Sequence, residues 1–466
     1  MNEIQRRVRG KGGYKEVLVL SFPLILSTST WAIQHFVDRM FLSWYSAEAI
    51  AASMPAGMLN FTVMSLFIGT ASFAGTFVAQ YYGAGRFDRI GKIVWQGFYV
   101  GLAGGLVHLF LIPFAGYIFN FAGHAPEIRV YEIIYFRILC LGAVPAIAAS
   151  SFSGFFSGRG RPWPVMWISF LQTAVNLVLD YCMIFGRWGF PEMGIAGAAS
   201  ATVISAFFAF AVYALMLRNR EFHKFFGAPG VKKLDTILFG RLMHFGLPNG
   251  IQFFIDTAGF AIFIMLMGRL GILELAASNI AFNINTLAFM PMIGVGIAVS
   301  ILVGQNLGRN DADTAERSVY SGFHLTFIYM AAIAFLYVAV PDIFIRPFAP
   351  RIYPGDFENI HRMAIVLLRF IAFYCLFDTM NIIFLSALRG AGDTRYTMKM
   401  IIIASVFVLI IPAYIVIVLL KLNIYSAWFV ATAYVTILGF SFLVRFMKGK
   451  WKHMRVIEHM PVEDNL

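Results

Sequence analysis

The chain of 466 residues is 59% hydrophobic and only 13% charged, whereas an average soluble protein is about 25% charged. This composition excludes a soluble globular protein and predicts a polytopic membrane protein. The net charge of +12 does not indicate nucleic-acid binding, because the Lys and Arg residues form short clusters between apolar segments, as in the cytoplasmic loops of membrane proteins.

Twelve apolar segments are each long enough to cross a bilayer, which takes about 20 residues. The predicted spans cover residues 16–43, 49–80, 92–120, 130–157, 163–187, 193–217, 241–268, 277–306, 316–346, 358–388, 394–421 and 425–447. An even number of spans places both termini on one side of the membrane. Most of the Lys and Arg residues between the spans fall on that same side. The sequence therefore predicts a multi-pass protein of the inner membrane with both termini in the cytoplasm.

The longest polar segment inside the chain, residues 219–240, separates six spans from six spans. The two groups resemble each other, since Pro23 recurs as Pro248 at an offset of 225 residues that several other positions share. Farther along, Arg137 recurs as Arg369 at an offset of 232 residues. We therefore expect an all-α fold of two six-helix repeats in the same orientation. The predicted parts are an N-terminal lobe (1–218), a cytoplasmic linker (219–240), a C-terminal lobe (241–447) and a cytoplasmic tail (448–466).

Four carboxylates lie well inside predicted spans, and each follows a polar side chain by four residues. The pairs are Gln34 with Asp38, Asn176 with Asp180, Gln252 with Asp256, and Tyr374 with Asp378. This spacing places both members of a pair on one helix face, and an aspartate facing lipid costs roughly 3 kcal/mol. We therefore expect these faces to line a watery cavity, where the carboxylates bind sodium or exchange a proton. The alternative is a structural polar network between helices.

The sequence lacks the short motifs that mark common enzyme active sites. The segment Gly158-Arg159-Gly160 lacks the Lys-Ser/Thr of a phosphate-binding loop, and HExxH and GxSxG do not occur. Three cysteines, Cys140, Cys182 and Cys375, show no metal-ligand spacing. We expect no enzyme activity and no cofactor.

The chain resembles the multidrug and toxic compound extrusion (MATE) transporters over nearly its whole length. The resemblance rests on the two six-span repeats, on Phe36-Val37-Asp38 in the first span, and on Leu388-Arg389-Gly390-Ala391-Gly392-Asp393-Thr394 after the tenth. It implies two lobes around a cavity, alternating access, and export of organic cations in exchange for sodium or protons.

The resemblance also implies two sets of site residues. In the first lobe, the residues similar to the family's cation or proton site are Asp38, Asn176, Asp180 and Thr202. In the second lobe, the residues similar to the cation site of sodium-coupled members are Asp256, Tyr374 and Asp378. Sodium-coupled members often carry Glu where this chain has the shorter Asp256, which favours the first lobe. Gln34 and Gln252 are candidates for the substrate cavity.

We therefore expect a secondary antiporter that exports small cationic or amphipathic compounds in exchange for Na⁺ or H⁺. The alternative is a flippase or exporter of a lipid-linked or endogenous metabolite with the same architecture, which would need a cavity rich in basic residues. A membrane-embedded enzyme acting on lipid would need clustered His and acids, but the nine His residues are scattered. The expected partners are substrates and membrane lipids, and the expected state is a monomer.

Overall fold

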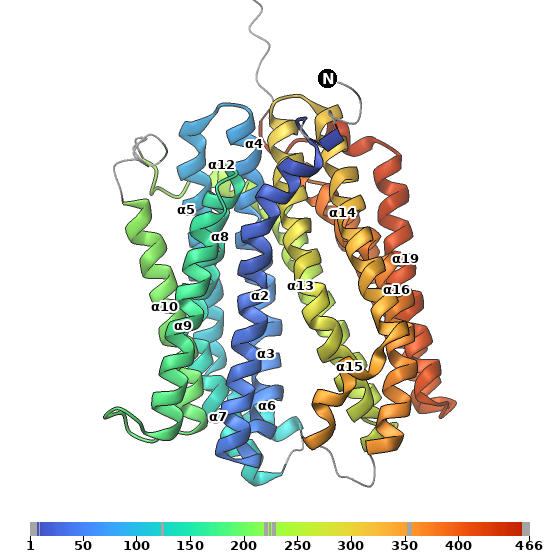
Figure 1. Ribbon diagram of the computed structural model, residues 1–466. Helices are drawn as coiled ribbons and strands as arrows, with labels where there is room; N and C mark the ends of the chain where they lie inside the picture. Colours follow the sequence, from blue (N-terminus) through green and yellow to red (C-terminus); the bar gives the residue numbers. More distant parts are fainter. Residues whose placement is uncertain are drawn as a thin grey trace, which may run out of the picture. The chain divides into compact units, whose positions relative to one another are not determined.

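A computed structural model describes residues 7–8, 10–122, 125–218, 222, 225, 230–351 and 357–458. Every regular element among these residues is helical (Figure 1). Eleven helical segments are long and apolar enough to cross a membrane, and one bent pair of helices forms a twelfth candidate span. The prediction of an all-α polytopic membrane protein with twelve spans is confirmed.

The helices keep the labels of Figure 1. The first half of the chain contains α2 (Tyr14–Tyr45), α3 (Ala47–Ser72), α4 (Ala74–Gly83), α5 (Phe87–Leu111), α6 (Ala115–Ala122), α7 (Pro126–Leu141), α8 (Ala143–Gly158), α9 (Trp163–Phe185) and α10 (Ile195–Leu217). The second half contains α12 (Thr236–Met267), α13 (Ile272–Gly308), α14 (Ala312–Ala339), α15 (Pro341–Ile345), η2 (Arg346–Arg351), α16 (Phe357–Ala391), α17 (Thr394–Ala404), η3 (Ser405–Ile410), α18 (Ile411–Tyr414), η4 (Ile415–Leu419), α19 (Ile424–Met447) and η5 (Lys450–His453).

Polar residues mark the beginnings of several of these apolar helices. The side chains of Ser46, Asp311 and Asn423 accept hydrogen bonds from the first-turn amides of α3, α14 and α19. Such caps satisfy backbone donors that have no partner inside the helix. Within the spans, the helix itself pairs the backbone groups, which is necessary where no water is present.

The predicted span 130–157 is two helices and not one. Helices α7 and α8 meet at Gly142 with a bend of 46°. Pro145 stands in the first turn of α8 and has no amide hydrogen to donate to the carbonyl group of Leu141. The bend therefore has a local cause that an apolar count along the chain does not register.

The span from Thr394 to Leu419 also departs from a regular α-helix. It contains two π-helical stretches, η3 and η4, on either side of the short helix α18 that begins next to Pro412. Wider helical turns of this kind often occur at functional positions. Here the first stretch begins at Ser405, which lies in one of the polar clusters described below.

The described chain forms two compact units. Unit 1 comprises Met1–Ile25, Ile255–Leu307 and Asp311–Met454, whereas unit 2 comprises Leu26–Phe254, Gly308–Asn310 and Arg455–Leu466. The first helix of each repeat, α2 or α12, contributes to both units. The predicted lobe boundaries at 1–218 and 241–447 stay a prediction, since much of the linker 219–240 and the tail beyond 458 lie outside the described residues.

Unit 2 is held together by closely packed helices. Helices α5 and α8 pack together, α3 packs on α7, and α9 and α10 run side by side (Figure 1). At the contact of α4 with α8, a methyl group on Gly154 would lie 2.9 Å from the backbone of Gly75. Small residues thus let these helices approach closely, as is typical in membranes.

Unit 1 has a separate apolar core. Helix α16 packs between α14 and α19, and the buried core includes Phe263, Met292, Leu368 and Trp428. Gly390 lies so close to the backbone of Ser300 that a side chain there would overlap it. Each unit can therefore hold polar groups in fixed positions.

Candidate functional site

Two of the predicted carboxylates face each other in unit 2. Asp38 on α2 and Asp180 on α9 are 6% and 0% exposed, and their side chains lie within hydrogen-bonding reach of each other. The two residues are 142 positions apart in the sequence, so only the packing of α2 beside α9 unites them. Two adjacent carboxylates can share one proton, or they can hold one cation between them.

The protein supplies this pair with few hydrogen bonds. Oδ1 of Asp38 and both carboxylate oxygens of Asp180 accept none from any described residue. One turn earlier on α9, the amide of Asn176 is fully buried, and neither its nitrogen nor its oxygen has a described partner. Buried polar atoms normally have partners. This cluster therefore has free coordination capacity for a cation, a proton or water.

Tyr135 of α7 is a member of the same cluster that the sequence did not suggest. It is nearly buried, and it lies close enough to Asp38 and Asp180 to interact with both electrostatically. The sequence around Tyr135 has the pattern of an ordinary apolar span with aromatic residues. The only signal was a polar hydroxyl group at membrane depth.

Two other predicted residues are less closely associated with the pair. Thr202 lies on α10, which packs against α9, and its side chain is partly exposed. Gln34 is buried one turn before Asp38 on α2. Among the described residues, no hydrogen bond links either side chain to Asp38, Asn176 or Asp180, so the structure unites the acids more closely than the rest of the predicted set.

The carboxylates of unit 1 are in a different situation. Asp256 on α12 accepts a hydrogen bond from the hydroxyl of Tyr434 on α19, at 3.3 Å. That hydroxyl also lies 3.2 Å from Oγ of Ser405. Asp378 on α16 accepts a hydrogen bond from Nδ2 of Asn381, at 3.0 Å. Each carboxylate thus has a donor from its own unit.

The predicted residues of unit 1 do come together. Asp256 and Asp378 lie close enough to interact electrostatically, and Tyr374 accepts a hydrogen bond from Nδ2 of Asn285 at 3.3 Å. The partly buried side chain of Arg389 also interacts with Asp256. Sequence reasoning missed the supporting polar residues, because Asn, Tyr and Ser are common in membrane helices.

Gln252 and Asp256 were expected to share one helix face. They lie one turn apart on α12, but Gln252 belongs to unit 2 and Asp256 to unit 1. The side chain of Gln252 is fully buried, and its amide atoms have no hydrogen-bond partner among the described residues. It remains a candidate for contact with a polar ligand.

The side chains that could coordinate an ion limit which ions could bind. Within the described residues, no group of three or more His, Cys, Asp and Glu side chains could hold a metal ion. The cluster of Asp38, Asp180 and Asn176 instead offers two carboxylates and an amide. Oxygen ligands of this kind suit hard cations.

Known proteins resemble this chain over most of its length. The MatE family model matches residues 23–182 and again residues 248–415, so the two matches follow the internal repeat. A "Probable multidrug resistance protein NorM" from Thermotoga maritima is 25% identical over 455 residues, covering 97% of this chain and 96% of the relative. A protein of the same description from Bradyrhizobium diazoefficiens is 28% identical over 390 residues, covering 83% of this chain and 82% of the relative.

Solved structures share the fold. One described as the outward-facing conformation of a multidrug resistance MATE family transporter superposes with a TM-score of 0.85 at 18% identity, covering 97% of this chain and 99% of that one. A MOP superfamily transporter from Pyrococcus furiosus, whose binding pocket is described as having reverse polarity, gives a TM-score of 0.83 at 18% identity, with the same coverage. At this identity the likeness concerns the fold alone.

Proposed function

Because this chain belongs to the MatE family of multidrug and toxic compound extrusion transporters, we propose that it exports small organic cations in exchange for Na⁺ or H⁺. Members of this family are transporters and not enzymes. The chain is accordingly a multi-pass membrane transporter. The names of its relatives support multidrug compounds as the substrates.

The observation that carries the proposal is the pair of Asp38 and Asp180. Two buried carboxylates within hydrogen-bonding reach, without donors at three of their oxygens, are costly for a fold that only has to be stable. A bound sodium ion or proton would offset that cost. We therefore assign the coupling site to this pair, with Asn176 and Thr202 as further oxygen ligands when the ion is sodium.

Exchange follows from competition for negative charge. An organic cation is attracted to the unit 2 cluster while its carboxylates are charged. A proton or sodium ion that binds there neutralises the charge, weakens the attraction and releases the substrate. The ion drives the cycle only through its different affinity for the inward-open and outward-open states.

We assign a supporting role to the acids of unit 1. Asp256 and Asp378 each accept a hydrogen bond from the protein, and these bonds occupy part of their capacity to bind an ion. Their charges still contribute to the field that attracts a cation. Gln34 and Gln252 are the polar residues that we propose for substrate contact.

The same proposal covers the cellular setting. The excess of Lys and Arg on one side of the predicted spans supports the cytoplasmic membrane of the cell, with both termini in the cytoplasm. We propose a monomer surrounded by lipid, with no cofactor beyond the coupling ion.

Transport of a fluorescent cationic dye by the purified protein in lipid vesicles tests the function. A sodium gradient and a pH gradient are imposed separately, and vesicles without protein provide the background rate. We expect one gradient to drive dye movement well above background, and that gradient identifies the ion. Dye movement at the background rate under both gradients would contradict antiport of organic cations.

A further inference from the structure

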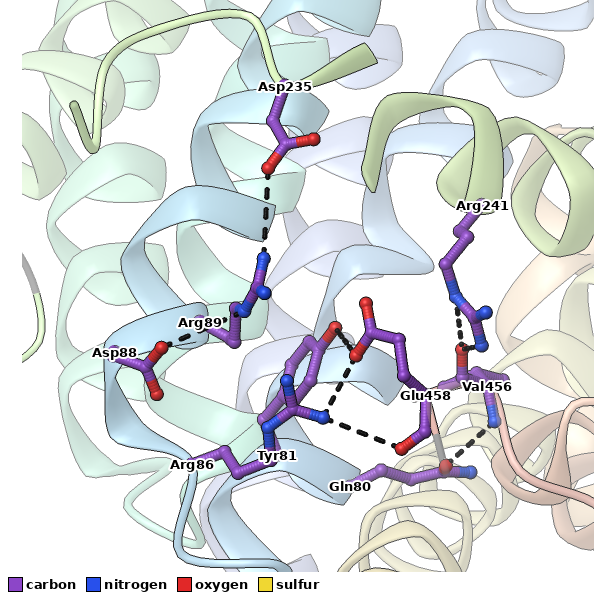
Figure 2. Close-up of polar contacts among 9 residues, drawn as sticks. All are labelled: Gln80, Tyr81, Arg86, Asp88, Arg89, Asp235, Arg241, Val456 and Glu458. Atoms are coloured by element: carbon purple, nitrogen blue, oxygen red, sulfur yellow. Dashed lines mark hydrogen bonds and ion pairs between the residues drawn. The ribbon is translucent and has the colours of Figure 1, made fainter. Parts of the chain in front are cut away.

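The last described segment of the chain, residues 455–458, lies in unit 2, although the helices before it belong to unit 1. Unit 1 ends at Met454 after α19 and η5, and the chain enters unit 2 at Arg455. Three helix ends of unit 2 contact this segment: the C-terminal end of α4, the N-terminal end of α5 and the beginning of α12 (Figure 2).

Side chains bind both backbone groups of Val456. Its amide donates to Oε1 of Gln80 at 2.9 Å, and both atoms are buried. Its carbonyl accepts a hydrogen bond from Nε of Arg241 at 3.1 Å and another from Nη2 of the same guanidinium. Recognition of a segment through its backbone groups is typical of peptide-binding sites.

A charged pocket holds the side chain of the residue that ends the segment. Oε2 of Glu458 accepts hydrogen bonds from the hydroxyl of Tyr81 and from Nη1 of Arg86, both at 3.0 Å (Figure 2). Burial alone would raise the pKa of Glu458, but its own backbone amide, Tyr81, and the charges of Arg86 and Arg241 together lower it below 4.5. The carboxylate is therefore charged at neutral pH.

Apolar contacts complete the site, while part of it stays in contact with solvent. Val456 and Ile457 are 0% and 7% exposed and belong to the same apolar cluster as Phe77 and Leu238. The ion pair of Arg86 with Glu458 is partly open, with side chains 22% and 31% exposed. The segment therefore combines a buried apolar anchor with an ionic end that is open to solvent.

We propose that the ends of α4, α5 and α12 form a docking site for residues 455–458 of the chain itself, and that the docked segment is a latch that slows the transport cycle. The effect on rate rests on the proposed transport function, whereas the docking does not. The occupant is an apolar–apolar–acidic segment, Val456-Ile457-Glu458.

The slowing follows from the connectivity of the chain. The latch begins where unit 1 ends and is bound within unit 2. A transport cycle that changes the arrangement of the units has to stretch or release it. A contact that exists in only one state stabilises that state and delays its departure.

Peptide binding tests the docking without any transport. A chain that ends at Met454 is mixed with a fluorescent peptide of residues 455–466, and anisotropy gives the dissociation constant. We expect saturable binding that Arg241→Ala or Arg86→Ala weakens by about tenfold, as for a lost charged hydrogen bond.

Arg89→Ala is the matched control. Arg89 lies one turn from Arg86 but interacts with Asp88 and Asp235 and not with the segment (Figure 2). It should leave the affinity unchanged. Absent binding, or equal weakening by all three substitutions, would overturn the docking site.

Dye export tests the latch. We expect the chain that ends at Met454 to export dye on the order of fivefold faster than the full chain, a typical size for a coupled effect. The peptide added at the cytoplasmic face should restore the slower rate, and a chain that ends at Glu458 should keep it. Glu458→Gln in the full chain should give an intermediate rate. This variant tests the latch without truncation, which could impair folding.

The possible failures are distinguishable. An equal or slower rate after truncation overturns the latch. Background rates from all of these proteins overturn the proposed antiport, and specific peptide binding would then still support the docking site.

Discussion

The two acidic clusters differ in the hydrogen bonds that the protein donates to their carboxylates. In unit 2, Asp38 and Asp180 face each other, and three of their oxygens have no described donor. In unit 1, Asp256 and Asp378 each accept a hydrogen bond, from Tyr434 and Asn381 respectively. Both clusters consist of acids at membrane depth, but only in unit 1 does each acid accept a hydrogen bond from a described residue.

We propose that this difference distinguishes an ion-binding site in unit 2 from a structural polar network in unit 1. A buried polar group without a partner costs roughly 1–3 kcal/mol, and such groups in native proteins call for an explanation. In our proposal, a bound ion would supply that explanation for unit 2. Polar side chains that bond one another between helices are the ordinary stabilising element of membrane proteins, as in unit 1.

The largest expected effect comes from comparing Asp38→Asn with Asp378→Asn. Asparagine keeps the size of the side chain but removes the charge that attracts an ion. We expect Asp38→Asn to lower gradient-driven dye export by at least about tenfold, or about 1.4 kcal/mol. Asp378→Asn should retain most of the rate. The initial rate in vesicles, normalised to the amount of folded protein, measures both.

A larger loss of export in Asp378→Asn than in Asp38→Asn would contradict this assignment, since the coupling site would then lie in unit 1. Equal loss in both variants would mean that the two clusters act together.

A smaller effect is expected from Tyr434→Phe in unit 1. The substitution removes the hydroxyl that donates to Asp256 and contacts Ser405. We expect it to lower the stability of the folded protein by about 1 kcal/mol while the ion specificity of export stays the same. Thermal unfolding in detergent gives the first quantity, and export under separate sodium and pH gradients gives the second. Changed ion specificity in the folded variant would show that unit 1 binds the coupling ion.

The sequence predicted the polar residues better than it predicted their partners. An aspartate in an apolar span is conspicuous because of its cost, so Asp38, Asp180, Asp256 and Asp378 could be found one at a time. That Asp38 meets Asp180 depends on how α2 packs against α9, and no local pattern contains this information. Four-residue spacing located Asn176 correctly on the face of Asp180, because it is a property of a single helix.

Other features depend on signals that are too short or too common to interpret. The bend between α7 and α8 has its cause in Gly142 and Pro145, yet proline and glycine are tolerated inside many membrane helices. The tail after residue 448 was expected to be simply cytoplasmic. The docking of Val456 and Ile457 involves two apolar residues in a polar segment, which no periodicity can distinguish from chance.

The central claim is that the coupling ion binds to the unit 2 pair, and ion release on substrate binding tests it most directly. A cationic dye is added to the purified protein in weakly buffered solution, while a pH indicator and a sodium electrode record the release. We expect about one proton or sodium ion to be released per dye molecule by the native protein and by Asp378→Asn. Asp38→Asn should release none. Undiminished release by folded Asp38→Asn would contradict the account.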